Sequence, residues 1–250
     1  MKDTGKQFIR DTYYDRVSQS AQEQGAPQPP LELPIPPNAV VIPLPPFDAV
    51  EHPPMTLVDA IVQRRSLRQY RQEALSMGEL SLLLHTSQGI TELIERRKFS
   101  ITLRTVPSAG ARHAFETYLL INQVEGVTPG LYRYSALQHA LVEISIDPGA
   151  AEALTQACFG QKQVLNAAVT FAWAAVVERM AWRYVERGYR YLFLDAGHVC
   201  QNVSIVAEAI DCGVCAIAAY DDEAVNAVLG LDGESQFAIY LAALGKKPTG

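Results

Sequence analysis

The chain has 250 residues, of which 48% are hydrophobic and 19% charged, and its net charge is −6 at pH 7. This composition is typical of a globular protein with a sizeable core. The acidic balance argues against a general nucleic-acid-binding protein, and the lack of an apolar run of about 18 residues predicts no membrane span. The polar start is unlike a secretory signal peptide, so we expect a cytoplasmic protein.

The first 55 residues differ in composition from the rest of the chain. Eleven of the 15 prolines lie between Pro27 and Pro54. Because proline disrupts helices and central strands, we expect an extended leader, partly polyproline II, whose apolar residues favour packing over a surface. A ligand for a proline-recognising module is the alternative. We therefore divide the chain into an extended, proline-rich leader over 1–55, with order beginning at Thr56, and a folded domain over 56–250.

Two helices are predicted at the start of the folded domain. Residues 56–59 resemble a capping box, and the apolar residues that follow share one face of a helix that ends near Arg64. Residues 76–79 form a second capping box, which begins a helix that Gly89 ends. The basic stretch over 93–105 has no clear period, and we expect a mobile loop there.

Strands and further helices fill the remainder. The patterns predict strands over 117–123, 167–177, 214–219 and 237–244, and a hairpin from 130–134 and 140–144. They predict helices over 150–158, 190–210 and 222–229. The helix over 190–210 is apolar nearly all round, so we expect it in the core. Helices and strands mixed over one core indicate an α+β domain.

Four cysteines are present, and two of them, Cys212 and Cys215, form a C-x-x-C pair. Such a pair is typical of a redox site or of half a zinc site. No second pair supplies the remaining zinc ligands, so we predict no metal and interpret the cysteines as buried free thiols.

A basic cluster follows the first predicted helix and consists of Arg64, Arg65, Ser66 and Arg68. Guanidinium groups match phosphate oxygens in a bidentate way. The carboxyl end of a helix carries a negative partial charge, so an anion bound there needs several cations. The alternative is a solvated, salt-bridged helix end.

Three further segments have compositions suited to a ligand. The turn of Pro107, Ser108, Ala109 and Gly110 allows close backbone approach to a flat ring or an oxyanion, or is an ordinary turn. Small side chains over 215–222 leave room for a ligand at a strand end, or simply pack. Arginines and aromatics alternate over 182–191, which suits stacking on a flat substrate or RNA bases, or an amphipathic rim.

Taken together and in order, these motifs resemble the nitroreductase superfamily, and most closely the SagB-type dehydrogenases. The segments that carry the resemblance are 64–68, 107–110, 130–134, 178–184, 187–190, 196–202 and 229–233. The resemblance covers about Thr56 to Gly245. It implies an α+β nitroreductase-like fold with a central mixed, mainly antiparallel sheet flanked by helices. It also implies a homodimer, domain-swapped in appearance, with two FMN molecules at the interface.

The resemblance also implies roles for particular residues. Arg64, Ser66 and Arg68 match positions that hold the FMN phosphate and ribityl chain, with Arg65 beside them. Pro107, Ser108, Ala109 and Gly110 match the segment that the other subunit lays against the flavin ring. Ile217, Ala218 and Ala219 match the stretch whose backbone amide faces flavin N5. Lys246 matches a basic position that completes the phosphate site.

The chain departs from the family pattern in two places. Many nitroreductases have Pro-Ile-Glu-Gly where residues 216–219 read Ala-Ile-Ala-Ala. Azoline-oxidising relatives carry a Lys-Tyr pair where this chain has Arg183 and Tyr184. Arginine stays protonated, so a lysine-dependent proton transfer would be lost. We expect Tyr184 and Arg183 to bind or protonate substrate.

The resemblance implies an FMN-dependent oxidoreductase in which hydride passes through flavin N5. Its activity is then NAD(P)H-dependent reduction of an electron-poor compound or a SagB-type dehydrogenation, with a small-molecule or peptide substrate. One alternative is a peptide azoline (thiazoline or oxazoline) oxidase in natural-product tailoring. Another is a non-catalytic FMN-binding partner protein within a complex. We expect neither a nucleic-acid nor a membrane partner.

Overall fold

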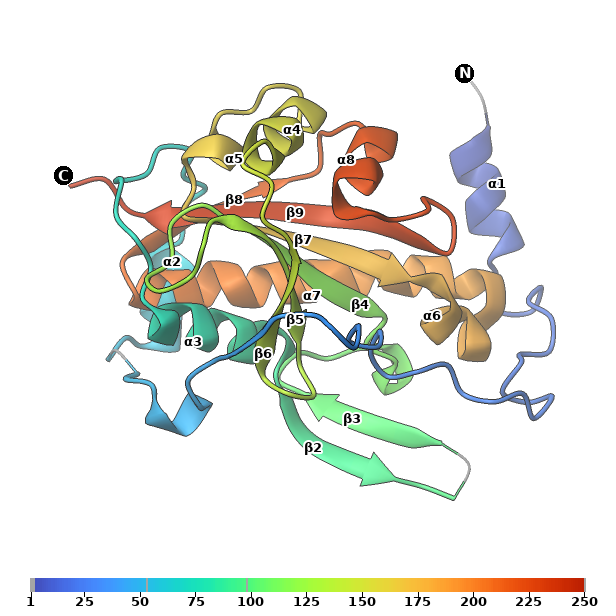
Figure 1. Cartoon of the computed structure of the whole chain (residues 1–250). Coiled ribbons are helices and arrows are strands. Elements are labelled where there is room, and N and C mark those ends of the chain that lie inside the picture. The colour runs from blue at the N-terminus through green and yellow to red at the C-terminus, as the bar shows by residue number, and fades with distance from the viewer. Residues whose placement is uncertain (1–2, 53, 98, 250) are drawn as a thin grey trace.

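The computed structural model describes residues 3–52, 54–97 and 99–249. Its centre is a seven-stranded sheet in the order β1–β6–β5–β4–β7–β9–β8, and each neighbouring pair of these strands is antiparallel (Figure 1). The strands are β1 (Val41–Pro43), β4 (Phe115–Ile121), β5 (Gly130–Ser135), β6 (Ala140–Ser145), β7 (Val169–Val176), β8 (Cys212–Ile217) and β9 (Gln236–Lys246). Among the described residues, parallel pairing is confined to isolated bridges such as Ser66–Val214. The sheet that we expected to be mixed and mainly antiparallel therefore has only antiparallel pairs between its named strands.

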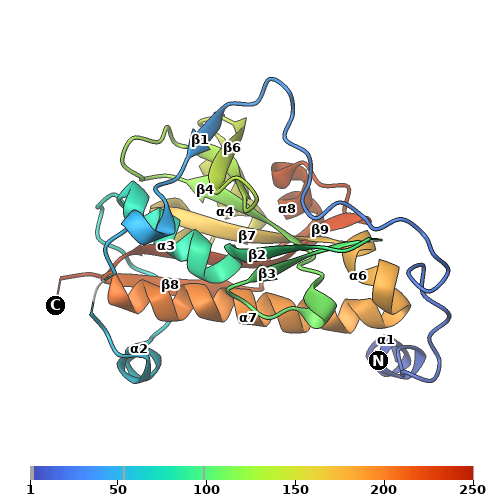
Figure 2. The same ribbon diagram turned by 90° about the horizontal axis from the view of Figure 1, so that it is seen from below.

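Helices cover both faces of this sheet (Figures 1 and 2). The helices are α1 (Thr4–Asp11), α2 (Leu57–Gln63), α3 (Met77–Gln88), α4 (Ala150–Ala157), α5 (Gln163–Asn166), α6 (Val177–Tyr184), α7 (Gly188–Ala209) and α8 (Asp222–Leu229). Short 3-10 turns are η1 (Phe47–Ala49), η2 (Ala109–Ala111) and η3 (Val185–Arg187). Helices α3 and α7 pack on one face and α4 and α8 on the other, so the sheet separates two apolar clusters. No helix in the described part of the chain is long and apolar enough to cross a membrane.

The central strand β7 is buried along its whole length, as its largely apolar sequence predicted. Phe171 and Trp173 pack toward α3 and α7, while Ala172 and Ala174 face the cluster under α4 and α8. The predicted hairpin is also confirmed, because β5 and β6 pair in antiparallel register. The sheet therefore forms where period and composition predicted it.

Both predicted capping boxes begin a helix. Thr56 accepts a hydrogen bond from the Asp59 amide at 3.1 Å at the start of α2. At the start of α3, Ser76 and Glu79 bond each other's backbone amides reciprocally. Helix α7 confirms the predicted core helix, and one side of it is nevertheless exposed. Phe193 and Leu194 are each 60% exposed, because they lie on the side of α7 that faces away from the sheet.

Residues 93–105 are not the irregular loop that we expected. Strands β2 (Ile90–Glu95) and β3 (Ser100–Arg104) form an antiparallel hairpin that extends away from the central sheet (Figure 1). Most of its residues are exposed or half-buried, so neither strand shows the alternation that half-buried strands have. Gln28 of the leader fastens the hairpin through hydrogen bonds to the Ser100 amide and carbonyl, at 2.7 and 2.8 Å.

The leader lies against the folded domain, as the predicted packing of its apolar residues over a surface favoured, so the ordered chain extends N-terminal to Thr56. It also contains helix α1, a departure from the extended chain expected over 1–55. Beyond α1 the leader crosses the surface and meets a buried ion network in which Glu116 pairs with Arg133 and Arg179. Arg179 donates to the Pro30 carbonyl at 2.8 Å, and the Leu33 amide donates to Glu116 at 2.8 Å. Buried charges of the domain thus hold the leader backbone in place.

The four cysteines are free and buried, as interpreted from the sequence. Burial raises the pKa of Cys158 and Cys200 to about 11, and that of Cys212 to about 12. These thiols therefore stay protonated near neutral pH and pack as small apolar groups.

Candidate functional site

The arginine cluster lies where α2 ends. Arg65 donates to the carbonyls of Val62 and Arg64, both at 2.8 Å, and so satisfies the end of the helix. Within the described ranges, Arg64 and Arg68 have no carboxylate oxygen within 4.0 Å. The cluster therefore divides into one arginine that caps its own helix and two whose charge is available to an anion.

Arg64 and Ser66 line a hollow of about 150 Å³ between α7 and the edge of the sheet. The Leu67 amide donates to the Val214 carbonyl at 3.1 Å, and this bond holds the cluster against β8. The remaining lining residues are Gly197, Cys200, Gln201, Ser204, Val214, Ala216 and Tyr240. A cation, two hydroxymethyl groups and small side chains make this hollow suitable for a phosphate-bearing ligand.

The end of β8 borders the same hollow. The side chain of Ile217 is buried in the opposite cluster, whereas Ala218 and Ala219 are exposed. Strand β8 is the outermost strand of the sheet. Ala216 lines the hollow, and the predicted segment continues from it with two small, exposed residues, while the Ile217 side chain points away.

The turn at Pro107–Gly110 is held by α7 and by its own hydrogen bonds. The Ala109 amide lies 3.3 Å from both carboxylate oxygens of Asp195, and Ser108 Oγ accepts from the His113 amide at 2.9 Å. Burial raises the pKa of Asp195. Sequence reasoning assigned Asp195 no role. The signal that could have found it is a carboxylate placed among the apolar residues of a long helix.

Gly110 brings the turn against Arg183 and Tyr184. It has a φ of +57°, and a side-chain carbon there would overlap the Tyr184 hydroxyl and lie 3.2 Å from Arg183 Nε. The next residue after Tyr184, Val185, has a φ of +49°. This conformation is strained for a β-branched residue, and such strain gathers at functional sites. The structure therefore joins two predicted elements separated by more than 70 positions in the sequence.

Arg112 supports this junction and was missed by sequence reasoning. Its guanidinium donates to the Gly110 carbonyl at 3.1 Å and stacks over Trp182, 5.2 Å from the ring centroid. Burial lowers the pKa of Arg112, and the nearby charge of Arg183 lowers it further. Two guanidinium groups thus lie close to Tyr184.

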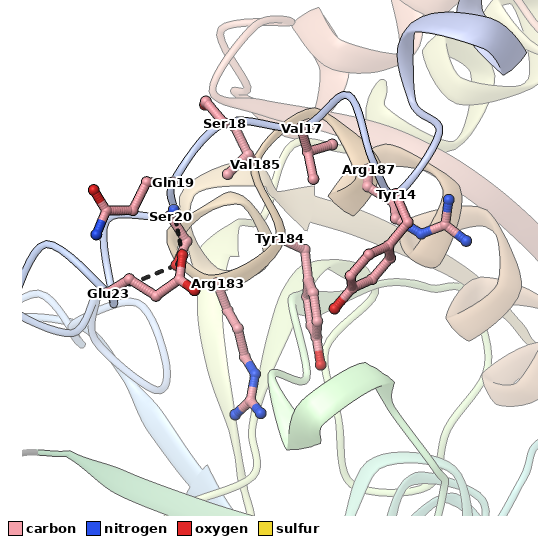
Figure 3. A pocket seen from close by; sticks show the side chains of 10 residues that line it. All are labelled: Tyr14, Val17, Ser18, Gln19, Ser20, Glu23, Arg183, Tyr184, Val185 and Arg187. Carbon is pink, nitrogen blue, oxygen red and sulfur yellow. Dashed lines mark hydrogen bonds between the residues drawn. The ribbon is translucent and has the colours of Figure 1, made fainter.

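Arg183 and Tyr184 line a cavity of about 290 Å³ whose other wall is the leader (Figure 3). The cavity is lined by Tyr14, Val17, Ser18, Gln19, Ser20, Glu23, Arg183, Tyr184, Val185 and Arg187. In Figure 3 the Tyr184 and Arg183 side chains extend in the same direction, with Tyr14 beside Tyr184. None of the leader residues of this wall was predicted, because no local pattern links them to α6.

The arginines over 187–190 bind the leader and not a flat ligand. Arg187 donates to the Thr12 carbonyl at 2.8 Å, and Arg190 donates to Thr12 Oγ1 at 2.6 Å and to the Ile9 carbonyl. These contacts place cations at the carboxyl end of α1, where a helix favours positive charge. These hydrogen bonds engage both guanidinium groups with the leader, which favours the alternative of an amphipathic rim over stacking on a substrate or RNA.

Lys246 does not join the arginine cluster. Its ammonium pairs with Glu79 and donates to the Ile210 carbonyl at 3.0 Å. It lines a different cavity, between α3 and the carboxyl end of α7. The two remaining parts of the site lie along α7, the Gly110–Tyr184 contact near Asp195 and the Arg64 hollow at Gly197 and Gln201. Each opens separately in this single chain.

Comparison with known proteins agrees with this fold. Residues 61–246 match the nitroreductase family. A protein of Methanocaldococcus jannaschii described as a nitroreductase is 32% identical over 191 residues, which are 76% of this chain and 91% of that protein. The trifolitoxin-processing protein TfxB of Rhizobium leguminosarum bv. trifolii is 29% identical over 163 residues, 63% of this chain and 44% of TfxB. A crystal structure of an Anabaena variabilis protein described as a nitroreductase superposes with a TM-score of 0.67 at 26% identity, over 85% of this chain and 42% of that one.

The chain belongs to the nitroreductase family, a family of oxidoreductases, and it has SagB-type relatives. It spans less than half of TfxB and of the Anabaena protein. The sequence expectation for the family is confirmed, and the α+β fold with an antiparallel sheet agrees with it.

Proposed function

We propose that this protein is an FMN-dependent oxidoreductase. The observation that carries the proposal is the pair of arginines, Arg64 and Arg68, left without a carboxylate partner in the described ranges, of which Arg64 lines a small hollow at the sheet edge. Unpaired guanidinium groups next to a hydroxyl fit the phosphate and ribityl chain of FMN. The family membership supports the same assignment.

In this proposal each group has a distinct task. Arg64, Ser66 and Arg68 hold the phosphate, and the exposed residues Ala218 and Ala219 face the ring. FMN, when bound, supplies hydride transfer through its N5 atom. The Tyr184 hydroxyl, fixed over Gly110, holds or delivers a proton at the substrate, and the Arg183 guanidinium binds a negative or electron-rich group on it.

We further propose that two copies of the chain form the complete site. The apolar face of α2 is unpartnered in the single chain, with Leu57, Val58, Ile61 and Val62 between 49% and 68% exposed. Phe193 and Leu194 are exposed on α7, against which α2 packs. Monomeric proteins rarely expose such contiguous apolar surface, so a second copy is the occupant that fits the family resemblance. In such a dimer, the 107–110 turn of one subunit would approach the arginine hollow of the other.

Reduction of an electron-poor small molecule with NAD(P)H as the donor is the activity that the site favours. Arginine at position 183 cannot accept a proton near neutral pH, which argues against a dehydrogenation that needs a basic group there. Azoline oxidation on a peptide remains the second candidate, favoured by the relationship to TfxB. Single-turnover mixing with NADH or NADPH separates the two: rapid bleaching of bound flavin supports the reductase, and no bleaching supports the oxidase.

The proposal as a whole is tested by purification and cofactor titration. The full-length protein should show flavin absorbance or should acquire it when FMN is added. One chain has a mass of 27.4 kDa, and size-exclusion chromatography with light scattering should give twice this mass. A colourless protein that gains no flavin spectrum with FMN would contradict the proposal.

A further inference from the structure

We propose that leader residues 14–23 form the specificity wall of the substrate pocket, with Tyr14 a substrate-contact residue, and that the pocket takes a compact, flat carboxylate. This inference rests on the proposed function, since it takes the cavity at Arg183 and Tyr184 as the substrate site. The family match begins at residue 61, so this wall lies outside the matched region.

The wall is fastened at both of its ends. Before it, Arg187 and Arg190 bind Thr12, and Thr12 is buried. At its other end, the Gln22 amide donates to the Trp182 carbonyl at 2.9 Å, and just beyond it Trp182 Nε1 donates to the Ala26 carbonyl at 3.1 Å. A segment held at both ends on α6 and α7 keeps a fixed position over Tyr184, as a specificity wall must.

The charges in the cavity favour an anionic ligand at one end. Arg183 has no hydrogen-bond or ion-pair partner among the described residues, whereas Arg187 is engaged by Thr12 and by Tyr191 at 2.7 Å. Glu23 already accepts from the Ser20 amide and hydroxyl, both at 2.8 Å, and these bonds keep it ionised. Its charge repels an anion from the leader side, which leaves the Arg183 end for a carboxylate.

The shape and aromatic lining favour a small flat molecule. Tyr14 and Tyr184 present rings to the cavity, and in Figure 3 the Tyr14 hydroxyl points toward Tyr184. At about 290 Å³ the cavity is near the lower end of the range for small-molecule sites. The side chains of Val17 and Val185 add apolar surface beside the two rings, within a lining that is otherwise largely polar.

The neighbouring tyrosines provide a matched test. Tyr13 and Tyr14 are both exposed, and each lies under an arginine, Arg190 at 6.0 Å and Arg187 at 5.4 Å, but Tyr13 does not line the cavity. We would titrate the FMN-treated full-length protein with 4-nitrobenzoate and with neutral 4-nitrobenzamide by calorimetry. The same titrations would be run on Tyr14→Ala, Tyr13→Ala and Arg183→Gln, with FMN affinity measured separately by flavin fluorescence.

We expect wild type to prefer the carboxylate by about tenfold or more, the scale of one charge-assisted hydrogen bond. Tyr14→Ala and Arg183→Gln should weaken carboxylate binding by about tenfold, on the same scale, and Tyr13→Ala should leave it unchanged. Equal affinities for carboxylate and amide, or equal loss in both tyrosine variants, would overturn the inference. Carboxylate binding with this pattern but no FMN binding would support the pocket and defeat the proposed function. FMN binding without carboxylate binding would support the proposed function and overturn the inference about the pocket.

Discussion

The hydroxyl of Tyr184 lies directly over Gly110, so closely that any side chain at position 110 would overlap it. The two residues come from a turn and from the end of a helix, and the packing of η2 against α6 brings them together. Gly110 has a positive φ, which removes the cost that other residues would meet there. The contact fixes the one phenol that sequence reasoning assigned to the chemistry.

Gly110→Ala should therefore displace Tyr184. The left-handed conformation alone costs about 1 to 2 kcal/mol of folding free energy, and the overlap with Tyr184 adds a local rearrangement. Gly126→Ala is the matched control, because Gly126 also has a positive φ but no atom within 4 Å of the added carbon. Urea denaturation should show a loss of stability in both variants, and turnover should fall only in Gly110→Ala. Equal turnover in the two would show that Tyr184 needs no support from this contact.

Arg64→Ala and Arg68→Ala should each weaken FMN binding by about 1.5 to 3 kcal/mol, as expected for a lost charge-assisted hydrogen bond. Arg65→Ala should leave FMN affinity unchanged, because this guanidinium is engaged by the carbonyls of Val62 and Arg64. Fluorescence titration with FMN distinguishes the three variants. Unchanged affinity in all of them would return the cluster to a surface role.

Lys246→Met should lower stability and leave FMN affinity intact. The lysine is buried and pairs with Glu79, so its loss removes a charged hydrogen bond worth about 1.5 to 3 kcal/mol. Adding Glu79→Gln should recover part of the loss, since the amide can still bond the Ser76 backbone. Chemical denaturation and FMN titration check the two effects. Weaker FMN binding in Lys246→Met would place the lysine in the phosphate site after all.

Acid should destabilise the fold through His113. Burial, with the charges of Arg104 and Arg112, lowers the pKa of His113 to about 3 in the folded state. An unfolded histidine titrates near 6.5, so below this pH the unfolded chain binds more protons and stability falls with acidification. At pH 5 the cost from His113 is about 2 kcal/mol relative to neutral pH.

The variant His113→Asn tests this, because asparagine tolerates the positive φ at this position. The difference in unfolding free energy between pH 7 and pH 5 should shrink by about 2 kcal/mol in the variant. Parallel pH profiles for wild type and variant would show that another group is responsible.

Ile61→Glu should produce a monomer if α2 forms the interface between copies. A charge on the apolar face of α2 would be buried without a partner in the dimer. Leu165→Glu is the matched control, because Leu165 is an exposed apolar residue on α5, on the other face of the sheet. Light scattering should report half the wild-type mass for Ile61→Glu and the full wild-type mass for Leu165→Glu. A dimer that survives this change would place the interface elsewhere.

The sequence by itself determined the elements whose signals are local. Thr56 and Ser76 begin helices because each side chain bonds an amide three positions away, and β7 is central because its apolar run has no polar face to expose. The order of the motifs also indicated the family. Local signals failed for the β2–β3 hairpin, which buries too little to show a period, and for α1 in the leader.

Only the tertiary structure decided which distant residues meet. It paired Lys246 with Glu79, turned Arg187 and Arg190 toward α1, and laid Tyr14 beside Tyr184. These contacts join positions far apart in the chain, and the free energy of each depends on burial and on competing partners that no short window of sequence contains. A basic residue near a motif is available to a ligand only when the fold leaves it without a carboxylate. By that test, among the cations predicted to hold the phosphate, Arg64 and Arg68 remain and Lys246 does not.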